Sequence, residues 1–162
     1  MQILTSYLSG RTFYVHYGEA ESSDKSIAAG VPQGSVLGPI LYLLYTADIP
    51  SHKDTTLATF ADDTAVLSPH ANYNIATSRL QVAVTQIVNW ATRWKIKINA
   101  GKTGLSTSSS QLYNNPTIIN DEPVQLAESA RYLGVHLDSK LNWRTHIQKK
   151  REQLKLRFRE MY

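Results

Sequence analysis

The sequence of 162 residues contains no cysteine, which excludes a disulfide framework, a thiolate zinc site and a cysteine nucleophile. No run approaches the roughly 18 consecutive apolar residues of a membrane-spanning helix. The first residues also lack the basic and apolar segments of a secretory signal. Because hydrophobic residues make up 42% and charged residues 19% of the chain, we exclude a fibrous or disordered protein and expect one domain with a buried core.

The net charge of +4 is carried by the C-terminal residues. Residues 144–162 contain seven Lys or Arg and two acids, whereas the other 143 residues contain ten basic and eleven acidic side chains. A basic segment of this kind is typical of proteins that bind a polyanion. A solvated helix face has the same composition, so charge alone leaves both interpretations open.

Residue patterning predicts an α+β fold. Strands are predicted at 12–17, 26–28, 95–98 and 133–137, with a weaker one from 105, and helices at 39–46, 75–93 and from 139 to the chain end. Pro39 is predicted as the first residue of its helix and Asp138 as an N-cap. The central helix has one apolar stripe, formed by Leu80, Val84, Ile87, Ala91 and Trp94. Together these elements predict an antiparallel sheet with helices on one face.

The pair Asp62-Asp63 separates two short apolar runs, which predicts a tight hairpin with the acids at its tip. Aspartate favours turns for local reasons, so a structural role is one interpretation. Two neighbouring carboxylates also repel each other, and a divalent cation would compensate that repulsion. Oxygen ligands without His or Cys suit Mg²⁺. Since adjacent strand residues point to opposite faces, a further carboxylate must come from another strand.

Residues 30–39 contain three glycines and two prolines, and we call this segment the glycine loop. No lysine follows the glycines, so the segment is not a Walker loop. Its glycines allow a close approach of the backbone to a nucleotide, Gln33 offers hydrogen bonds, and a helix N-terminus behind the loop favours phosphate. A loop that only leads into a helix is the alternative interpretation.

In this order, these segments resemble the reverse transcriptases of non-LTR retrotransposons, particularly the jockey-like elements of insects. The resemblance runs from about Arg11 to Ile147 and is carried by residues 30–39, 45–50, 60–63, 94–99, 102–103, 132–135, 141–143 and 146–147. It implies the palm of a right-handed polymerase and the start of the thumb. It also implies Mg²⁺ or Mn²⁺ as two ions, deoxynucleoside triphosphates, an RNA template, a DNA primer, no membrane and a nuclear location.

The resemblance also implies roles for individual residues. Asp62 would be the main metal ligand and Asp63 its neighbour with a weaker role. Lys102, otherwise an ordinary turn residue, would protonate the departing pyrophosphate. The remaining roles are contact with nucleotide or template by Gln33, Gly34, Ser35, Phe60 and Ala61, the primer grip by Tyr132, Leu133 and Gly134, and contact with the nucleic-acid backbone by Arg144, Lys149, Lys150 and Arg151.

The sequence departs from the family pattern at one catalytic position. The family places its first catalytic aspartate on a strand upstream of the glycine loop, whereas residues 1–29 hold acids only in a polar turn, at Glu19, Glu21 and Asp24. We therefore expect a fragment without fingers or first palm strand, with a partial palm at 1–138 and a basic thumb helix at 139–162. This fragment should have little or no polymerase activity alone. The alternatives are a non-catalytic nucleic-acid-binding relic and a poorly folded product with uncovered sheet edges.

Overall fold

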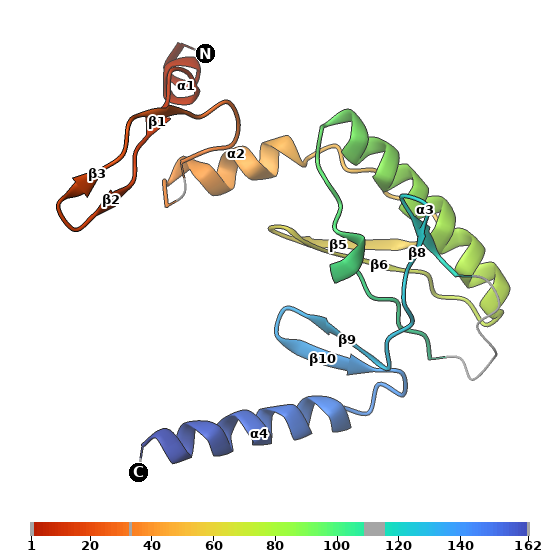
Figure 1. Cartoon of the computed structure of the whole chain (residues 1–162). Helices are drawn as coiled ribbons and strands as arrows, with labels where there is room; N and C mark the ends of the chain where they lie inside the picture. The colour runs from red at the N-terminus through yellow and green to blue at the C-terminus, as the bar shows by residue number, and fades with distance from the viewer. Residues whose placement is uncertain (1, 33, 109–115, 162) are drawn as a thin grey trace. The chain divides into compact units, whose positions relative to one another are not determined.

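The structure, a computed structural model, describes residues 2–32, 34–108 and 116–161 (Figure 1). The chain forms two compact units, residues 1–47 and residues 48–162. Gln33, which the resemblance assigns to the nucleotide and template, lies outside the described residues, as does most of the weak strand predicted from residue 105. Of the described part, Leu105 forms one isolated parallel bridge with Leu126, and residues 106–108 belong to no strand.

The first unit contains two helices and two pairs of short strands. They are α1 (Gln2–Leu8), β1 (Thr12–Phe13), β2 (His16–Tyr17), β3 (Ala20–Glu21), β4 (Lys25–Ser26) and α2 (Leu37–Tyr45), with β1 paired to β4 and β2 to β3. The strand predicted at 12–17 is therefore present as two pieces. The returning chain pairs at 20–21 and 25–26, earlier than predicted, and the backbone N–H of Ile27 then bonds the carbonyl of Arg11 at 2.8 Å.

Helix α2 begins two residues before the predicted start. Leu37 is its first residue and Pro39 its third, a place where the missing N–H of proline still breaks no helical hydrogen bond. The hydroxyl oxygen of Ser35 accepts the N–H of Gly38 at 3.0 Å and so satisfies one of the free donors of the first turn. This bond explains why the helix starts before the proline.

The core of the second unit lies along the long helix α3 (Tyr73–Arg93), which contacts β6 (Asp63–Leu67) and β7 (Ile118–Ile119). The helix predicted at 75–93 is thereby confirmed. Within the predicted stripe, Ala91 is buried and Trp94 is 37% exposed. The buried residues among the described part of this unit are Tyr73, Thr77, Ala83, Trp90, Ala91, Thr117, Ile119 and Val124.

The other elements of this unit are β5 (Thr56–Phe60), a short 3-10 helix η1 (Ala100–Lys102), β8 (Glu122–Pro123), β9 (Ser129–Tyr132), β10 (Val135–Asp138) and α4 (Arg144–Glu160). The strand predicted at 133–137 is shifted, because Leu133 and Gly134 form the turn between β9 and β10. The helix predicted toward the chain end is confirmed as α4.

Two local predictions in this unit are wrong. No strand is assigned at 95–98, because α3 ends with Lys95 at a φ of 56° and the N–H of Ile96 bonds the carbonyl of Ala91 at 2.8 Å, a helix-terminating pattern. Asp138 is not the N-cap of α4, which is Trp143. The carboxylate of Asp138 instead accepts the backbone N–H groups of Lys140 and Asn142, at 3.1 and 3.2 Å, in the preceding turn.

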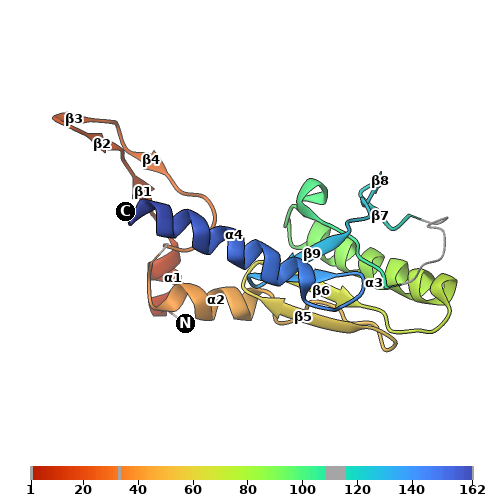
Figure 2. The ribbon, with the colours of Figure 1, turned by 90° about the horizontal axis from the view of Figure 1, so that it is seen from below.

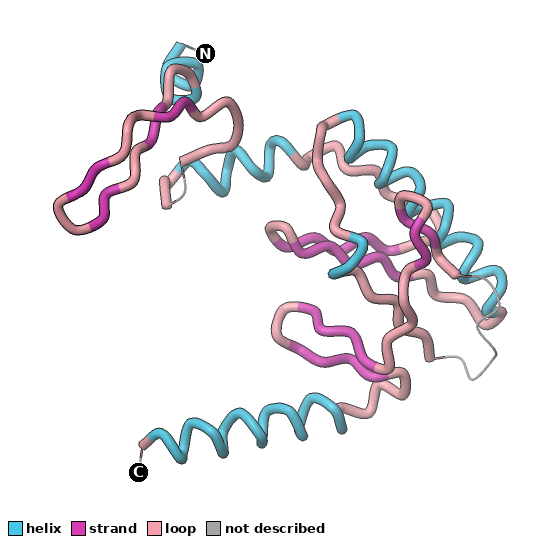
Figure 3. The backbone as a smooth tube through the Cα atoms, in the orientation of Figure 1, coloured by secondary structure: helices cyan, strands magenta, loops and turns pink. Residues whose placement is uncertain are grey.

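The strands of the described residues form five separate antiparallel pairs and not the single sheet that we predicted (Figure 3). The α+β content and the antiparallel pairing are confirmed. Each strand has two to five residues, at or below the usual length of a strand. Over the same residues, no helix has both the length and the hydropathy to cross a membrane.

Candidate nucleotide and nucleic-acid site

The acidic pair lies at the tip of the hairpin formed by β5 and β6, which we call the acidic hairpin. The predicted hairpin is present, but its turn is shifted by one residue: Phe60 pairs with Asp63, so Ala61 and Asp62 form a two-residue turn and Asp63 begins β6. Ala61 has a φ of 49°, a conformation that disfavours larger side chains. Asp62 and Asp63 are exposed, and Phe60 is 64% exposed across from the second acid. The hairpin thus presents two carboxylates beside an aromatic ring.

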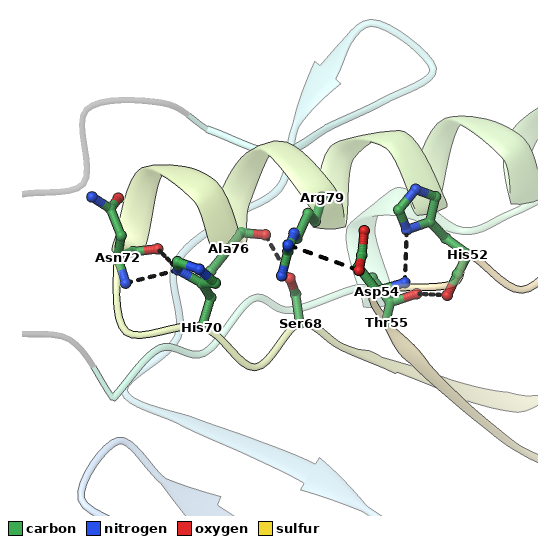
Figure 4. Close-up of polar contacts among 8 residues, drawn as sticks. All are labelled: His52, Asp54, Thr55, Ser68, His70, Asn72, Ala76 and Arg79. Atoms are coloured by element: carbon green, nitrogen blue, oxygen red, sulfur yellow. Dashed lines mark hydrogen bonds and ion pairs between the residues drawn. The ribbon is translucent and has the colours of Figure 1, made fainter.

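Contacts with α3 hold the base of the acidic hairpin (Figure 4). Just before β5, Asp54 forms an ion pair with Arg79 at 3.8 Å, and just after β6 the hydroxyl of Ser68 donates to the carbonyl of Ala76 at 2.8 Å. The connection then ends at the α3 N-cap, Asn72, whose side chain accepts two backbone N–H groups. Because α3 fixes both ends of the hairpin, the acidic tip extends from a rigid base.

The acidic tip fits part of a divalent-metal site. Exposed carboxylate oxygens are the donors that Mg²⁺ prefers, and Mg²⁺ is commonly held by one or two carboxylates together with substrate phosphates and water. Over the residues that the structure describes, no group of three or more His, Cys, Asp or Glu side chains gathers in one place. Asp62 and Asp63 therefore supply two carboxylates, and any further ligand comes from elsewhere.

The glycine loop belongs to the first unit, where Arg11 anchors its beginning. The guanidinium donates to the carbonyl of Gly30 at 2.5 Å and to that of Leu8, the last residue of α1, at 3.2 Å. Gly30 and Gly34 have φ values of 83° and 81°, which favour glycine. Sequence reasoning missed Arg11, because a side-chain contact across 19 residues leaves no local pattern.

Lys102 ends the 3-10 helix η1 and is exposed. Its backbone N–H bonds the side-chain oxygen of Asn99 at 3.2 Å, which caps this short helix. The role of Lys102 in proton transfer stays a prediction.

The hairpin of β9 and β10, which we call the grip hairpin, carries the predicted primer grip. Tyr132 pairs with Val135, and the turn between them consists of Leu133 and Gly134, with φ values of 48° and 78°. Two positive φ values are the pattern of a type I′ turn, which asparagine and glycine prefer. Leu133 is 47% exposed, so an apolar side chain projects at a position where leucine costs about 1 kcal/mol of backbone strain. Strain of this kind often marks a functional residue.

We expect Leu133→Asn to stabilise the chain by about 0.5–1 kcal/mol, because it converts the turn to the favoured Asn-Gly pair. The loss of a half-exposed leucine side chain offsets only part of this gain. Urea unfolding of both proteins measures the difference, with Leu141→Asn as the matched control at another positive φ, 50°. If Leu133→Asn instead lowered the free energy of unfolding, the grip hairpin would not have a type I′ turn.

The predicted basic residues lie on α4, which has no buried residue. Arg144, Lys149, Lys150 and Arg151 are all exposed. In Figures 1 and 2 the tips of the acidic hairpin and the grip hairpin point the same way, and α4 follows the grip hairpin directly. Within the second unit, the grip and basic residues thus lie on consecutive elements, whereas α3, η1, β7 and β8 separate them along the chain from the acidic hairpin.

Comparison with known proteins identifies relatives of the whole chain. Residues 1–137 match the family described as "Reverse transcriptase (RNA-dependent DNA polymerase)". The chain is 40% identical to the RNA-directed DNA polymerase from mobile element jockey of Drosophila melanogaster, over 90% of the chain and 17% of that protein. It is 38% identical to the jockey polymerase of Drosophila funebris, over 99% of the chain and 18% of that protein.

A third relative is the probable RNA-directed DNA polymerase from transposon X-element of Drosophila melanogaster, with 37% identity over 99% of the chain and 18% of that protein. The chain therefore spans less than a fifth of the length of these relatives. No solved structure matches it significantly.

Proposed function

Since the chain belongs to the reverse transcriptase family, we propose that it acts as part of the RNA-directed DNA polymerase of a non-LTR retrotransposon. The reaction is nucleotidyl transfer, in which a primer 3′-hydroxyl attacks a deoxynucleoside triphosphate and pyrophosphate departs. One observation carries the proposal: the acidic hairpin presents Asp62 and Asp63 at an exposed turn above a base that α3 holds. Positioned charge of this kind is what phosphoryl transfer requires of a protein.

In this proposal, Asp62 is the principal ligand of a divalent ion and Asp63 contributes more weakly. The family reaction uses two such ions, which neutralise charge on the phosphates and on the attacking and leaving oxygens. The rigid base of the acidic hairpin holds the carboxylates in place before substrate arrives. In the family pattern, the further carboxylate comes from an aspartate on a strand upstream of the glycine loop.

The other residues bind and orient the substrates. The glycine loop, with Gly34 and Ser35, would lie against the incoming nucleotide and the template, together with Phe60 and Ala61 of the acidic hairpin. Lys102 would donate a proton to pyrophosphate. Residues 1–138 would then form part of the palm, and residues 139–162 the beginning of the thumb.

The grip hairpin and α4 would hold the primer and template. The exposed leucine of the grip hairpin suits contact with the primer end, and the cations of α4 suit the phosphate backbone. Contacts of this second kind depend on salt and carry no sequence preference.

A primer-extension assay tests the proposal for the isolated chain. With Mg²⁺, an RNA template and a DNA primer, we expect little or no extension, because the described residues bring together two carboxylates and no third ligand. If the chain did extend the primer and Asp62→Asn abolished that extension, the chain would carry every catalytic ligand that the reaction needs. The alternative is a non-catalytic nucleic-acid-binding module. It would bind primer–template, and Asp62→Asn would change neither binding by this chain nor extension by a longer polymerase that contains it.

Single substitutions on α4 test the nucleic-acid contact. We expect Lys149→Gln, Lys150→Gln and Arg151→Gln each to weaken binding of an RNA–DNA duplex several-fold at about 0.1 M salt. Each should also lower the slope of log affinity against log salt by about 1. Fluorescence anisotropy of a labelled duplex over a salt series gives both values. Lys53→Gln, which removes the same charge before β5, is the matched control, and an equal effect there would contradict a specific role for α4.

A further inference from the structure

Two histidines and three basic residues gather where β10 meets the first turns of α4. The backbone N–H of His136 donates to Nδ1 of His146 at 3.2 Å, and the two rings lie 6.2 Å apart. Arg131 pairs with His136 across the grip hairpin. Lys149 and Lys150 follow His146 by one turn of α4 and lie on the same side of the helix. We call these five residues the histidine cluster.

The histidine cluster has no counterion of its own in the part of the chain that the structure describes. The one ion pair found there joins residues outside the cluster, so Arg131, Lys149 and Lys150 have no carboxylate within ion-pair distance. Asp138 is two residues along β10 from His136. Its Oδ1 accepts backbone N–H groups of the turn before α4, and its Oδ2 is buried and accepts no hydrogen bond in the described structure, so this carboxylate pairs with no cation of the cluster. The cluster therefore concentrates positive charge that a bound anion could neutralise.

We propose that the histidine cluster binds phosphate groups of a nucleic-acid backbone and takes up a proton when it does so. This inference rests on the proposed function and extends it, because the histidines and Arg131 had no assigned role. Phosphate oxygens accept charge-assisted hydrogen bonds from imidazolium, guanidinium and ammonium groups. Basic residues continue along the 17 residues of α4, about 25 Å of helix, so the surface fits an extended backbone and not a single triphosphate.

His136 is arranged to be neutral before phosphate arrives. Partial burial lowers the pKa of His136 from its ordinary value of 6.5, and the charges of Lys149, Arg131, His146 and Lys150 lower it further. Nδ1 of His146 accepts the backbone N–H of His136, which holds the two rings near each other. The ring of Trp143 packs edge-on against His146 at 6.1 Å. A phosphate beside these rings would favour the protonated imidazole and raise the pKa of His136 again.

Proton uptake gives stability and binding opposite dependences on pH. In the free chain the pKa of His136 is lower than in the unfolded chain. The stability it contributes is therefore complete above pH 6.5 and lost as the pH falls through the lowered pKa. In the complex the phosphate raises this pKa, so affinity rises as the pH falls over the same range. A structural role of the histidines would produce the first effect without the second.

Anisotropy titrations of a labelled RNA–DNA duplex against the full chain, at constant ionic strength, test the proposal. We expect affinity to rise roughly three- to ten-fold between about pH 7.5 and pH 5.5. His136→Gln should remove most of this rise, and His146→Gln, which removes the Nδ1 that accepts the His136 N–H, should remove part of it. His16→Gln, in β2 of the first unit, is the matched control and should leave the rise unchanged. Circular dichroism at each pH shows which variants are folded.

The outcomes separate this inference from the proposed function. No duplex binding at any pH would overturn the proposed function. Binding whose pH dependence is the same in the parent chain, His136→Gln and His146→Gln would overturn only the histidine cluster. A deoxynucleoside triphosphate used in place of the duplex should bind weakly with little pH dependence. Equal affinity and equal pH dependence for the triphosphate would overturn the assignment to an extended backbone.

Discussion

Asp62→Asn is expected to lower primer extension by about 10²–10³-fold in a polymerase that carries this chain's acidic hairpin. A suitable protein is a chimera in which residues 1–137 replace the aligned segment of the Drosophila melanogaster jockey polymerase, to which the chain is 40% identical. Asparagine keeps the size of the side chain and removes its charge. The loss therefore reports the charge that holds the metal ion. The measurement is the initial rate of extension of a DNA primer on an RNA template with Mg²⁺.

Two matched substitutions decide what such a loss means. Asp63→Asn should lower the rate about ten-fold, because the second acid lies in strand β6 and not in the turn. Asp121→Asn should leave the rate unchanged. It makes the same change in the two-residue turn between β7 and β8, where Asp121 has a φ of 65° that asparagine also tolerates. Equal rates in the Asp62→Asn chimera and the parent chimera would contradict a metal-binding role for the acidic hairpin.

The acidic hairpin was predictable because its information is local. Two apolar runs separated by an acidic pair specify both strands and place the turn within one residue, since the structure pairs Phe60 with Asp63 and turns at Ala61 and Asp62. The long helix α3 was predictable for the same reason, since its apolar spacing extends over several turns. Strongly periodic segments of this kind need no knowledge of their neighbours.

The sheet and the contacts between elements could not be predicted in the same way. The alternation at residues 95–98 predicts a strand, and Ile96 and Ile98 are indeed more buried than the lysines beside them. However, alternating burial does not supply a neighbouring strand to pair with. The hydrogen bond of Ile96 and the positive φ of Lys95 also end α3 here, so Lys95 is not extended as a strand requires. The histidine cluster likewise joins residues from three elements, and no sequence spacing indicates that they meet.

Asp48→Ala is expected to destabilise the chain by about 2–3 kcal/mol, although the sequence marks Asp48 only as part of residues 45–50, one of the segments that carry the resemblance. Its Oδ1 accepts the indole N–H of Trp90 at 2.8 Å, and its Oδ2 accepts that of Trp94 at 3.2 Å. Trp90 is only 7% exposed, so removal of the carboxylate leaves a buried donor without this acceptor. Hydrogen bonds to a charged group contribute about 1.5–3 kcal/mol, and an unsatisfied buried donor costs a similar amount.

Urea unfolding followed by tryptophan fluorescence measures this loss, because two of the three tryptophans contact Asp48. Asp48→Asn should lose about half as much, since an amide has one acceptor oxygen for two indole donors. Asp54→Ala is the matched control and should cost less than about 1 kcal/mol, because its ion pair with Arg79 is 3.8 Å long and partly exposed. If Asp48→Ala lowered the free energy of unfolding no more than Asp54→Ala does, the contact of the segment around Asp48 with α3 would not depend on the carboxylate. A large loss limited to Asp48 would show that one acid fixes the chain before the acidic hairpin to the helix that supports it.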